Sequence, residues 1–318
     1  MMLNVLLLVI GFVTLIKGAD FLVDGASSVA RRYGISELAI GLTIVAFGTS
    51  APELVVSVIS GINGHNEVAL GNVIGSNIFN LLLILGVTGL VYPLTVQGQT
   101  VQKEIPLSLL AAIMVFFLAN DQFFSSGAVN QISRWDSAVL LVFFFIFMAY
   151  VYSTIKPEEV SKGPEKTYTT GKAVLFIVLG LVGLIFGGKL VVDNAVEMAR
   201  DLGMSEKLIG LTIVAVGTSL PELATSVVAA LKKNSDIAVG NIIGSNIFNV
   251  FFILGISGLV LPIAYNPALN LDIYILMGAT VMLYVFMYTF KNHKLDRVEA
   301  GIMLACYLVY SVFIFWRN

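Results

Sequence analysis

The chain has 318 residues, of which 58% are apolar and only 12% are charged, and its formal net charge is −2. This balance is typical of an integral membrane protein and excludes a soluble enzyme. Basic residues do not form a patch with interleaved aromatic side chains, so the sequence gives no support for nucleic-acid binding. The single cysteine, Cys306, excludes an internal disulfide and a cysteine-based metal cluster.

Apolar blocks long enough to cross a bilayer follow one another along the chain. About 20 residues of helix span roughly 30 Å of hydrocarbon. The first block lacks the basic start and the cleavage motif of a signal peptide, so we expect it to be retained. We therefore predict an all-α integral membrane protein with about ten spans. They lie near residues 3–30, 38–62, 68–92, 104–119, 136–153, 171–199, 207–231, 238–261, 271–290 and 299–316.

The two halves of the chain are copies of each other. Residues 35–94 and 204–263 align without a gap at a constant offset of 169 and are identical at 34 of 60 positions. Each half holds five predicted spans, and because five is odd, the second copy must enter the membrane from the opposite face. The sequence predicts two inverted five-helix repeats, 1–153 and 172–318, joined by a hydrophilic cytoplasmic linker at 154–171.

Lysine and arginine residues are unevenly divided between the two sets of predicted loops. If the N-terminus lies outside, twelve fall in inside loops and four in outside loops. The positive-inside rule then favours both termini outside. Because the sequence has no large cytoplasmic domain or targeting extension, we expect a multi-pass protein of a prokaryotic plasma (inner) membrane.

Charged residues also occur within the first span of each half. Lys17, Asp20 and Asp24 are three and four residues apart, and Lys189 and Asp193 are four apart. This spacing favours ion pairs along one helix face, with the charges reaching toward the interface. A role in a sliding gate helix is the alternative.

An acidic motif occurs once in each half, as GTSAPEL at 48–54 and GTSLPEL at 217–223. It places Glu53 or Glu222 at membrane depth, where an ionisable group costs roughly 2.5 to 3.5 kcal/mol and marks a functional site. The proline before each glutamate cannot donate to the carbonyl four residues earlier, so we predict a broken helix in each half. Transporters hold ions at such breaks.

A polar motif follows in each half, GNVIGSNIFN at 71–80 and GNIIGSNIFN at 240–249. Its amides and hydroxyls recur at every fourth position, as Asn72, Ser76 and Asn80 in one copy and Asn241, Ser245 and Asn249 in the other. Helix association through amides is a sufficient explanation for Asn72 and Asn241. It explains the whole stripe poorly, because the same stripe accompanies the glutamate motif in both halves.

Together the two motifs offer only hard oxygen donors. The candidate side chains are Glu53, Glu222, Thr49, Thr218, Ser50, Ser219, Ser76, Ser245, Asn80 and Asn249. Ca²⁺ takes about six to eight such oxygens, and two carboxylates neutralise its charge; Na⁺ accepts the same donors. Zinc or copper would require His or Cys, and His65 and His293 fall in loops away from both motifs. The motifs predict a cation site and no resident cofactor.

The doubled pattern GTS-x-PEL and GN-x-IGSNIFN in a ten-span inverted repeat resembles the α-repeats of the cation/calcium antiporter superfamily, the sodium/calcium exchangers. The resemblance covers nearly the whole chain. It implies alternating access, with Glu53 and Glu222 binding Ca²⁺ beside the carbonyls of Thr49 and Thr218. It also implies flanking Na⁺ sites lined by Ala46, Thr49, Ser50, Ser76, Ala215, Thr218, Ser219 and Ser245. Some relatives have aspartate at the position of Asn249, and the amides here weaken the case for potassium coupling.

Two antiport reactions are open on these residues. The first is exchange of Na⁺ for Ca²⁺, and the alternative is H⁺/Ca²⁺ exchange through the same two glutamates. The hydroxyl-rich flanks favour Na⁺, because a proton needs no such cage. A channel usually builds its filter from symmetric subunits, whereas two copies within one chain supply the symmetry here, so we expect a monomer to function in the bilayer. An enzyme would need an activated nucleophile or a general base near a catalytic metal, and no His or Cys is available for either role. Acid chemistry by Glu53 and Glu222 within the membrane is the enzymatic alternative.

Overall fold

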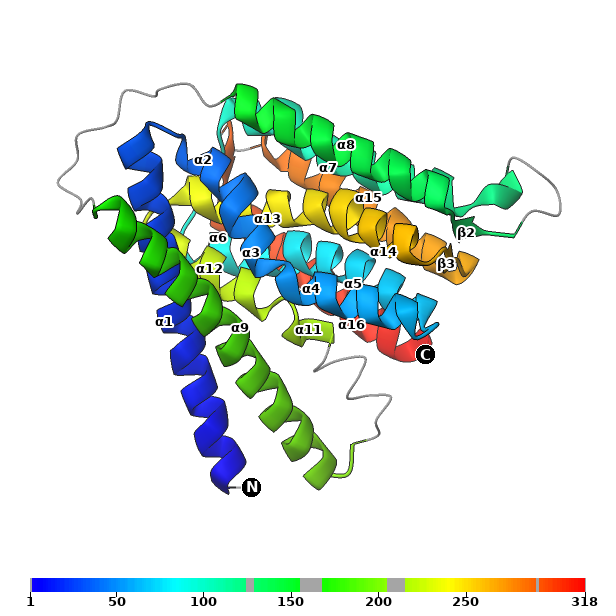
Figure 1. Ribbon diagram of the computed structural model, residues 1–318, viewed down its shortest axis with the longest axis horizontal. Helices are drawn as coiled ribbons and strands as arrows, with labels where there is room; N and C mark the ends of the chain where they lie inside the picture. The colour runs from blue at the N-terminus through cyan, green and yellow to red at the C-terminus, as the bar shows by residue number, and fades with distance from the viewer. Residues whose placement is uncertain (1, 124–128, 155–167, 205–214, 290–291, 318) are drawn as a thin grey trace.

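The fold is taken from a computed structural model, which describes residues 2–123, 129–154, 168–204, 215–289 and 292–317. Eight described helices are long and apolar enough to cross a membrane, and a helix pair bent by 46° adds a ninth, broken span. Of the remaining predicted span, 207–231, the structure describes only the part from residue 215 onward. The predicted all-α membrane fold is confirmed (Figure 1).

The helices of the two halves follow the same order. The first half contains α1 (Met2–Tyr33), α2 (Glu37–Ile40), π-helical η1 (Gly41–Val45), α3 (Ala46–Thr49), α4 (Ala51–Ile62), α5 (Asn66–Ile78), π-helical η2 (Phe79–Ile84), α6 (Leu85–Val91), π-helical η3 (Thr100–Glu104), α7 (Ile105–Ala119), 3₁₀-helical η4 (Asp121–Phe123) and α8 (Arg134–Ser153). The second contains α9 (Thr170–Asp201), α11 (Ala215–Gly217), α12 (Leu220–Leu231), α13 (Ser235–Ile247), π-helical η6 (Phe248–Leu254), α14 (Gly255–Val260), 3₁₀-helical η7 (Pro267–Leu269), α15 (Asn270–Phe286) and α16 (Arg297–Arg317). The bounds of α4 and α5 recur in α12 and α13 at the offset of 169 residues.

Local sequence signals explain where the long helices begin and end. Gly34 and Gly203 adopt φ values of +63° and +81°, a left-handed conformation that ends α1 and α9 at equivalent positions. At the start of α8, Ser133 and Asp136 form a capping box, in which each side chain accepts a hydrogen bond from the other residue's backbone N–H. The left-handed glycines at the ends of α1 and α9 therefore recur with the duplication.

The two halves interlock through their short strands and peripheral helices. Strand β1 (Leu94–Thr95) pairs antiparallel with β4 (Lys294–Leu295), and β2 (Gln131–Ile132) pairs antiparallel with β3 (Ile263–Ala264). Each two-stranded sheet thus takes one strand from each half. In the same way α6 packs against α16, and α14 packs against α8. The inverted repeats form one bundle rather than two separate bodies.

The most buried spans are the third of each half. The apolar windows of α5–η2–α6 and α13–η6–α14 are 78% and 83% buried, against 22–39% for the other long spans. These two spans therefore form the centre of the bundle, with the other helices around them. Both become π-helical directly after Ile78 and Ile247, where Asn80 and Asn249 follow. The four-residue spacing of the predicted polar stripe changes there, and π-helical turns are frequent at functional sites.

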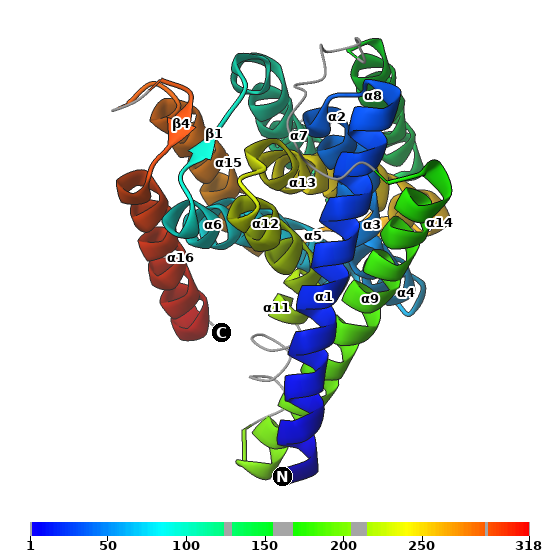
Figure 2. The same cartoon turned by 90° about the vertical axis from the view of Figure 1, so that its left-hand side faces the viewer.

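Helices α1 and α9 form a tight pair that crosses the other long helices at a steep angle and extends beyond the bundle (Figures 1 and 2). Glycines make the close approach possible. A Cβ atom placed on Gly18 would lie 2.7 Å from the backbone nitrogen of Leu184, and one on Gly180 would lie 2.5 Å from that of Leu22. Small residues of this kind let transmembrane helices pack backbone to backbone.

Candidate cation site

The breaks in the second span of each half place the two glutamates. Ser50 separates α3 from α4 with φ −82° and ψ 6°, and Ser219 precedes α12 with φ −90° and ψ 7°. Each proline then falls in the first helical turn, where a missing N–H is tolerated. Glu53 and Glu222 consequently lie in the first turns of α4 and α12, where the positive end of the helix dipole favours a carboxylate.

Serine hydroxyls join each glutamate to the opposite half. The Ser219 hydroxyl lies 2.9 Å from Glu53 Oε1, and the Ser50 hydroxyl donates to Glu222 Oε1 over 2.9 Å. Ser76 Oγ lies 3.0 Å from Ser219 Oγ and 3.5 Å from Glu53 Oε1. These serine–glutamate pairs join residues 166 and 172 positions apart, so the two acidic motifs converge into one buried cluster.

Asn241 and Asn72 hold the broken helices in place. Asn241 Nδ2 donates to the carbonyl oxygen of Glu222 over 3.3 Å, and its Oδ1 accepts from the Thr49 hydroxyl over 3.0 Å. Asn72 makes the equivalent contacts, donating to the Glu53 carbonyl over 3.2 Å and accepting from the Thr218 hydroxyl over 3.3 Å. These contacts agree with the explanation by helix association for the two asparagines.

Four further amides connect the central spans. Asn80 Nδ2 donates to Asn246 Oδ1 over 3.0 Å, and Asn249 Nδ2 donates to Asn77 Oδ1 over 2.9 Å. Asn77 and Asn246 also donate to each other's backbone carbonyls over 3.1 and 3.3 Å. The sequence reasoning missed Asn77 and Asn246. Their identical place in both copies of GSNIFN is the signal that would have found them.

Five buried oxygens of the cluster have no hydrogen-bond partner within the described part of the chain. They are Glu53 Oε2, Glu222 Oε2, Asn80 Oδ1, Asn249 Oδ1 and Ser245 Oγ. The described residues also place no lysine or arginine within ion-pair distance of either glutamate. Buried carboxylates and amide oxygens require a partner, so this arrangement fits a cation bound by hard oxygens.

The remaining residues of the predicted set are Ala46, Thr49, Thr218 and Ala215. Ala46 is fully buried on α3 and faces Gly244 of α13, where an added Cβ would come within 2.8 Å of the alanine methyl. Thr49 is buried and Thr218 is half-buried. Ala215 is the first residue of α11. The structure therefore brings the two predicted motifs together, while the ligand role of each residue stays a prediction.

A family model described as sodium/calcium exchanger protein matches residues 3–153 and 172–316. The chain belongs to the sodium/calcium exchanger family. This exchanger is 39% identical to the putative antiporter CaxA of Alkalimonas amylolytica over 99% of each chain. It is 31% identical to the sodium/calcium exchanger MaX1 of Methanosarcina acetivorans, covering 98% of this chain and 99% of the relative.

Solved structures agree with the family assignment. The exchanger superposes on the sodium-calcium exchanger NCX_Mj, soaked with Na⁺ and Ca²⁺, with a TM-score of 0.82 and 31% identity, over 96% of this chain and 97% of that one. The resemblance seen in the motifs, the inverted-repeat fold and the multi-pass membrane character are confirmed. The family is one of antiporters, and this agrees with the expectation of a transporter rather than an enzyme.

Proposed function

We propose that this exchanger transports Ca²⁺ against Na⁺ by alternating access, and that the buried cluster is the shared ion site. The observation that carries the proposal is the set of unpartnered buried oxygens, which includes one atom of each glutamate. The described residues give these two buried carboxylates no basic partner, which is costly, and a cation bound between them supplies the missing charge. The donors come from both halves, so an ion bound there contacts both repeats.

Competition for these oxygens would couple the two ions. Glu53 and Glu222, with the carbonyls of Thr49 and Thr218, suit Ca²⁺, because it prefers several oxygens including charged ones. Na⁺ needs less negative charge and suits the flanking groups, which are Ala46, Thr49, Ser50, Ser76, Ala215, Thr218, Ser219 and Ser245. Because the two sets overlap, occupation by one ion excludes the other. Asn80 and Asn249 complete the candidate set through their Oδ1 atoms, which have no partner in the described part of the chain.

H⁺/Ca²⁺ exchange is the second candidate, and the same two carboxylates support it. Each glutamate has one oxygen bound by a serine hydroxyl and one oxygen without a partner in the described structure. The unpartnered Oε2 atom can carry a proton in place of a bound cation. The hydroxyl-rich surroundings favour Na⁺, because a proton on a carboxylate needs no additional oxygen ligands.

We further propose that the monomer lies in a plasma (inner) membrane with both termini outside, as repeats 1–153 and 172–318 joined by the linker 154–171. Contacts between loops support the division of the loops between two faces, while the positive-inside rule supplies the orientation. The β1–β4 pair and the Gln97–Asp236 hydrogen bond join loops predicted to lie inside. The β2–β3 pair and the Asn120–Asn270 hydrogen bonds join loops predicted to lie outside. The family match is also interrupted at the linker.

Uptake of ⁴⁵Ca²⁺ into proteoliposomes loaded with Na⁺ and diluted into Na⁺-free buffer tests the function, with a proton gradient as the parallel condition. We expect the Na⁺ gradient to drive uptake and Glu53→Gln or Glu222→Gln to reduce it to background, because each change removes a carboxylate from the cluster. Glu67→Gln is the matched control, since Glu67 bonds Asn266 at the surface and lies outside the cluster.

If only the proton gradient drives uptake, the coupling ion is H⁺ and the Na⁺ assignment is wrong. Equal uptake by the wild type and both cluster variants would show that the glutamates are not the ion site.

A further inference from the structure

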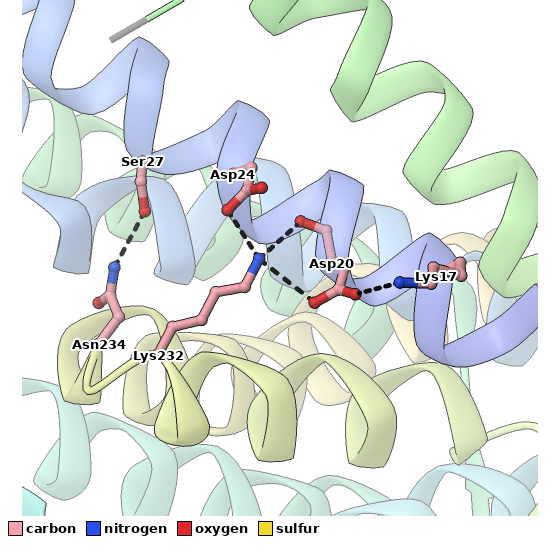
Figure 3. A network of polar contacts seen from close by, with 6 residues as sticks. All are labelled: Lys17, Asp20, Asp24, Ser27, Lys232 and Asn234. Atoms are coloured by element: carbon pink, nitrogen blue, oxygen red, sulfur yellow. Dashed lines mark hydrogen bonds and ion pairs between the residues drawn. The ribbon is translucent and has the colours of Figure 1, made fainter. Parts of the chain in front are cut away.

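A cluster of charged and polar side chains links α1 to the end of α12 (Figure 3). Lys232 directly follows the last residue of α12, and its Nζ lies 2.7 Å from Asp24 Oδ1 and 3.3 Å from Asp20 Oδ1 of α1. The same ammonium donates to the backbone carbonyl of Asp20 over 3.1 Å. Two residues further on, Asn234 Nδ2 donates to the Ser27 hydroxyl over 3.0 Å.

The sequence predicted ion pairs only within single helices, and the Lys17–Asp20 pair at 3.4 Å agrees with that prediction. Lys232 was not part of it. Because Lys232 and Asp20 are 212 residues apart, only the packing of α12 against α1 brings them together. Asp20 therefore has one lysine partner on its own helix and one on the helix that carries Glu222.

Among the described residues, the other half of the molecule shows no equivalent contact. At the offset of 169 residues, Asn63 stands in place of Lys232, and Lys189 and Asp193 stand in place of Asp20 and Asp24. Lys189 and Asp193 pair with each other along α9 at 3.0 Å, and both side chains are exposed. Asn63 is too short and carries no charge, so it offers no ammonium to α9. Lys232 therefore joins the end of α12 to α1 on one face of the bundle, and Asn63 makes no such ion pair with α9.

A polar cavity of about 530 Å³ lies beside this contact. Its lining includes Asp24, Ser27, Lys232 and Asn234, and also Val23, which is only 1% exposed. Water therefore reaches the α1–α12 interface on this face and meets the Lys232 contacts there. Tyr168, at the end of the predicted cytoplasmic linker, also lines the cavity.

We propose that Lys232 is a one-sided latch that holds α1 against the end of α12 and keeps this face of the exchanger closed. The inference rests on the proposed alternating access, in which one group of helices moves against another around a fixed site. Helix α12 carries Glu222 in its first turn and Lys232 at its end, so a shift of α1 relative to α12 must break the Lys232 contacts. An interaction present in one of two conformations shifts the population toward that conformation.

Thiol labelling of a Val23→Cys reporter in a Cys306→Ser background tests the latch. The protein is reconstituted in lipid nanodiscs, where both faces meet a membrane-impermeant maleimide. Because partly exposed ion pairs are weak, we expect Lys232→Gln to raise the labelling rate about twofold to fivefold. Lys17→Gln is the matched control, since it removes a lysine from the same aspartate without touching α12, and we expect no change.

Exchange of the two charges, Lys232→Asp with Asp24→Lys, rebuilds an ion pair and should return labelling to the slow rate. Equal labelling in the Lys232→Gln and Lys17→Gln variants, or fast labelling in the charge-exchanged protein, would overturn the latch. The proposed function is tested separately by wild-type ⁴⁵Ca²⁺ uptake. Normal Na⁺-driven uptake with unchanged labelling rejects the latch alone, whereas a labelling shift in a protein that does not exchange Na⁺ rejects Na⁺/Ca²⁺ exchange alone.

Discussion

Single hydroxyl groups connect the two halves at the candidate site. Ser219 of the second half contacts Glu53, and Ser50 of the first half contacts Glu222, each over 2.9 Å. A hydrogen bond to an ionised group contributes about 1.5 to 3 kcal/mol, roughly twice a neutral one. The serines therefore fix one oxygen of each carboxylate and leave the other oxygen for an ion.

Ser219→Ala removes a hydroxyl that is both the partner of Glu53 and a proposed Na⁺ ligand. We expect the Na⁺ concentration for half-maximal ⁴⁵Ca²⁺ exchange to rise about tenfold, which corresponds to about 1.4 kcal/mol. Ser60→Ala is the control. Ser60 lies on α4 two turns beyond Glu53, so its substitution should leave the Na⁺ dependence unchanged. Identical Na⁺ curves for the two variants would contradict a role for the Ser219 hydroxyl.

At the scale of the element, the α1–α9 pair depends on backbone contact rather than on large side chains. A Cβ atom on Gly180 would lie 2.5 Å from the Leu22 nitrogen and 2.8 Å from the Gly18 carbonyl oxygen. Backbone atoms cannot rotate away as a side chain can, so any added methyl must separate the two helices. Because α1 and α9 pack so closely, we expect them to move together as one unit. The Lys232 contacts then hold this unit against the end of α12.

Gly180→Ala should lower the free energy of unfolding by about 1 to 3 kcal/mol, because the overpacked methyl forces α1 from α9. Gly278→Ala is the matched control on α15, where an added Cβ meets no atom within 4 Å. There alanine should raise stability by up to about 1 kcal/mol, since glycine is the poorer helix former. Thermal unfolding in detergent checks both, and shifts of the same sign would refute the backbone-contact explanation.

At the scale of the whole molecule, elements of one repeat pair with or pack against elements of the other at both ends of the bundle. Each short sheet takes one strand from each half, and α6 and α14 pack on the last helices of the opposite repeats. The central spans also join through the amides of Asn77 and Asn246. The proposed ion site therefore lies where the halves are already interlocked, and a moving element must be sought at the periphery, where α1 and α9 lie (Figure 2).

The proposed topology predicts that tags at the two termini lie on the same side of the membrane and the linker 154–171 on the other. In inside-out vesicles, a protease should cut a site inserted in the linker and leave both terminal tags intact. In right-side-out cells the pattern should reverse, because twelve of the sixteen loop lysines and arginines are assigned to the inside. Tags on opposite faces would require an odd total number of spans. One repeat would then have an even number, which contradicts two five-helix repeats.

The sequence by itself determined the helical membrane fold, the duplication and the two motifs that converge at the site. These features are local: apolar length, the proline before Glu53 and Glu222, and repeated polar positions follow from neighbouring residues. The candidate set also includes every glutamate, serine and asparagine of the two motifs whose buried side-chain oxygen has no hydrogen-bond partner among the described residues. The ligand role of these residues stays a prediction.

Only the tertiary structure decided which residues meet across the halves. These contacts join residues 166 to 212 positions apart. They are the hydrogen bonds of Ser219 to Glu53 and of Ser50 to Glu222, the bond between Asn77 and Asn246, and the contacts of Lys232 with Asp20 and Asp24. No local spacing specifies such contacts. They depend on how two inverted copies pack around the central spans, and on the few positions, such as Asn63 and Lys232, where the copies differ.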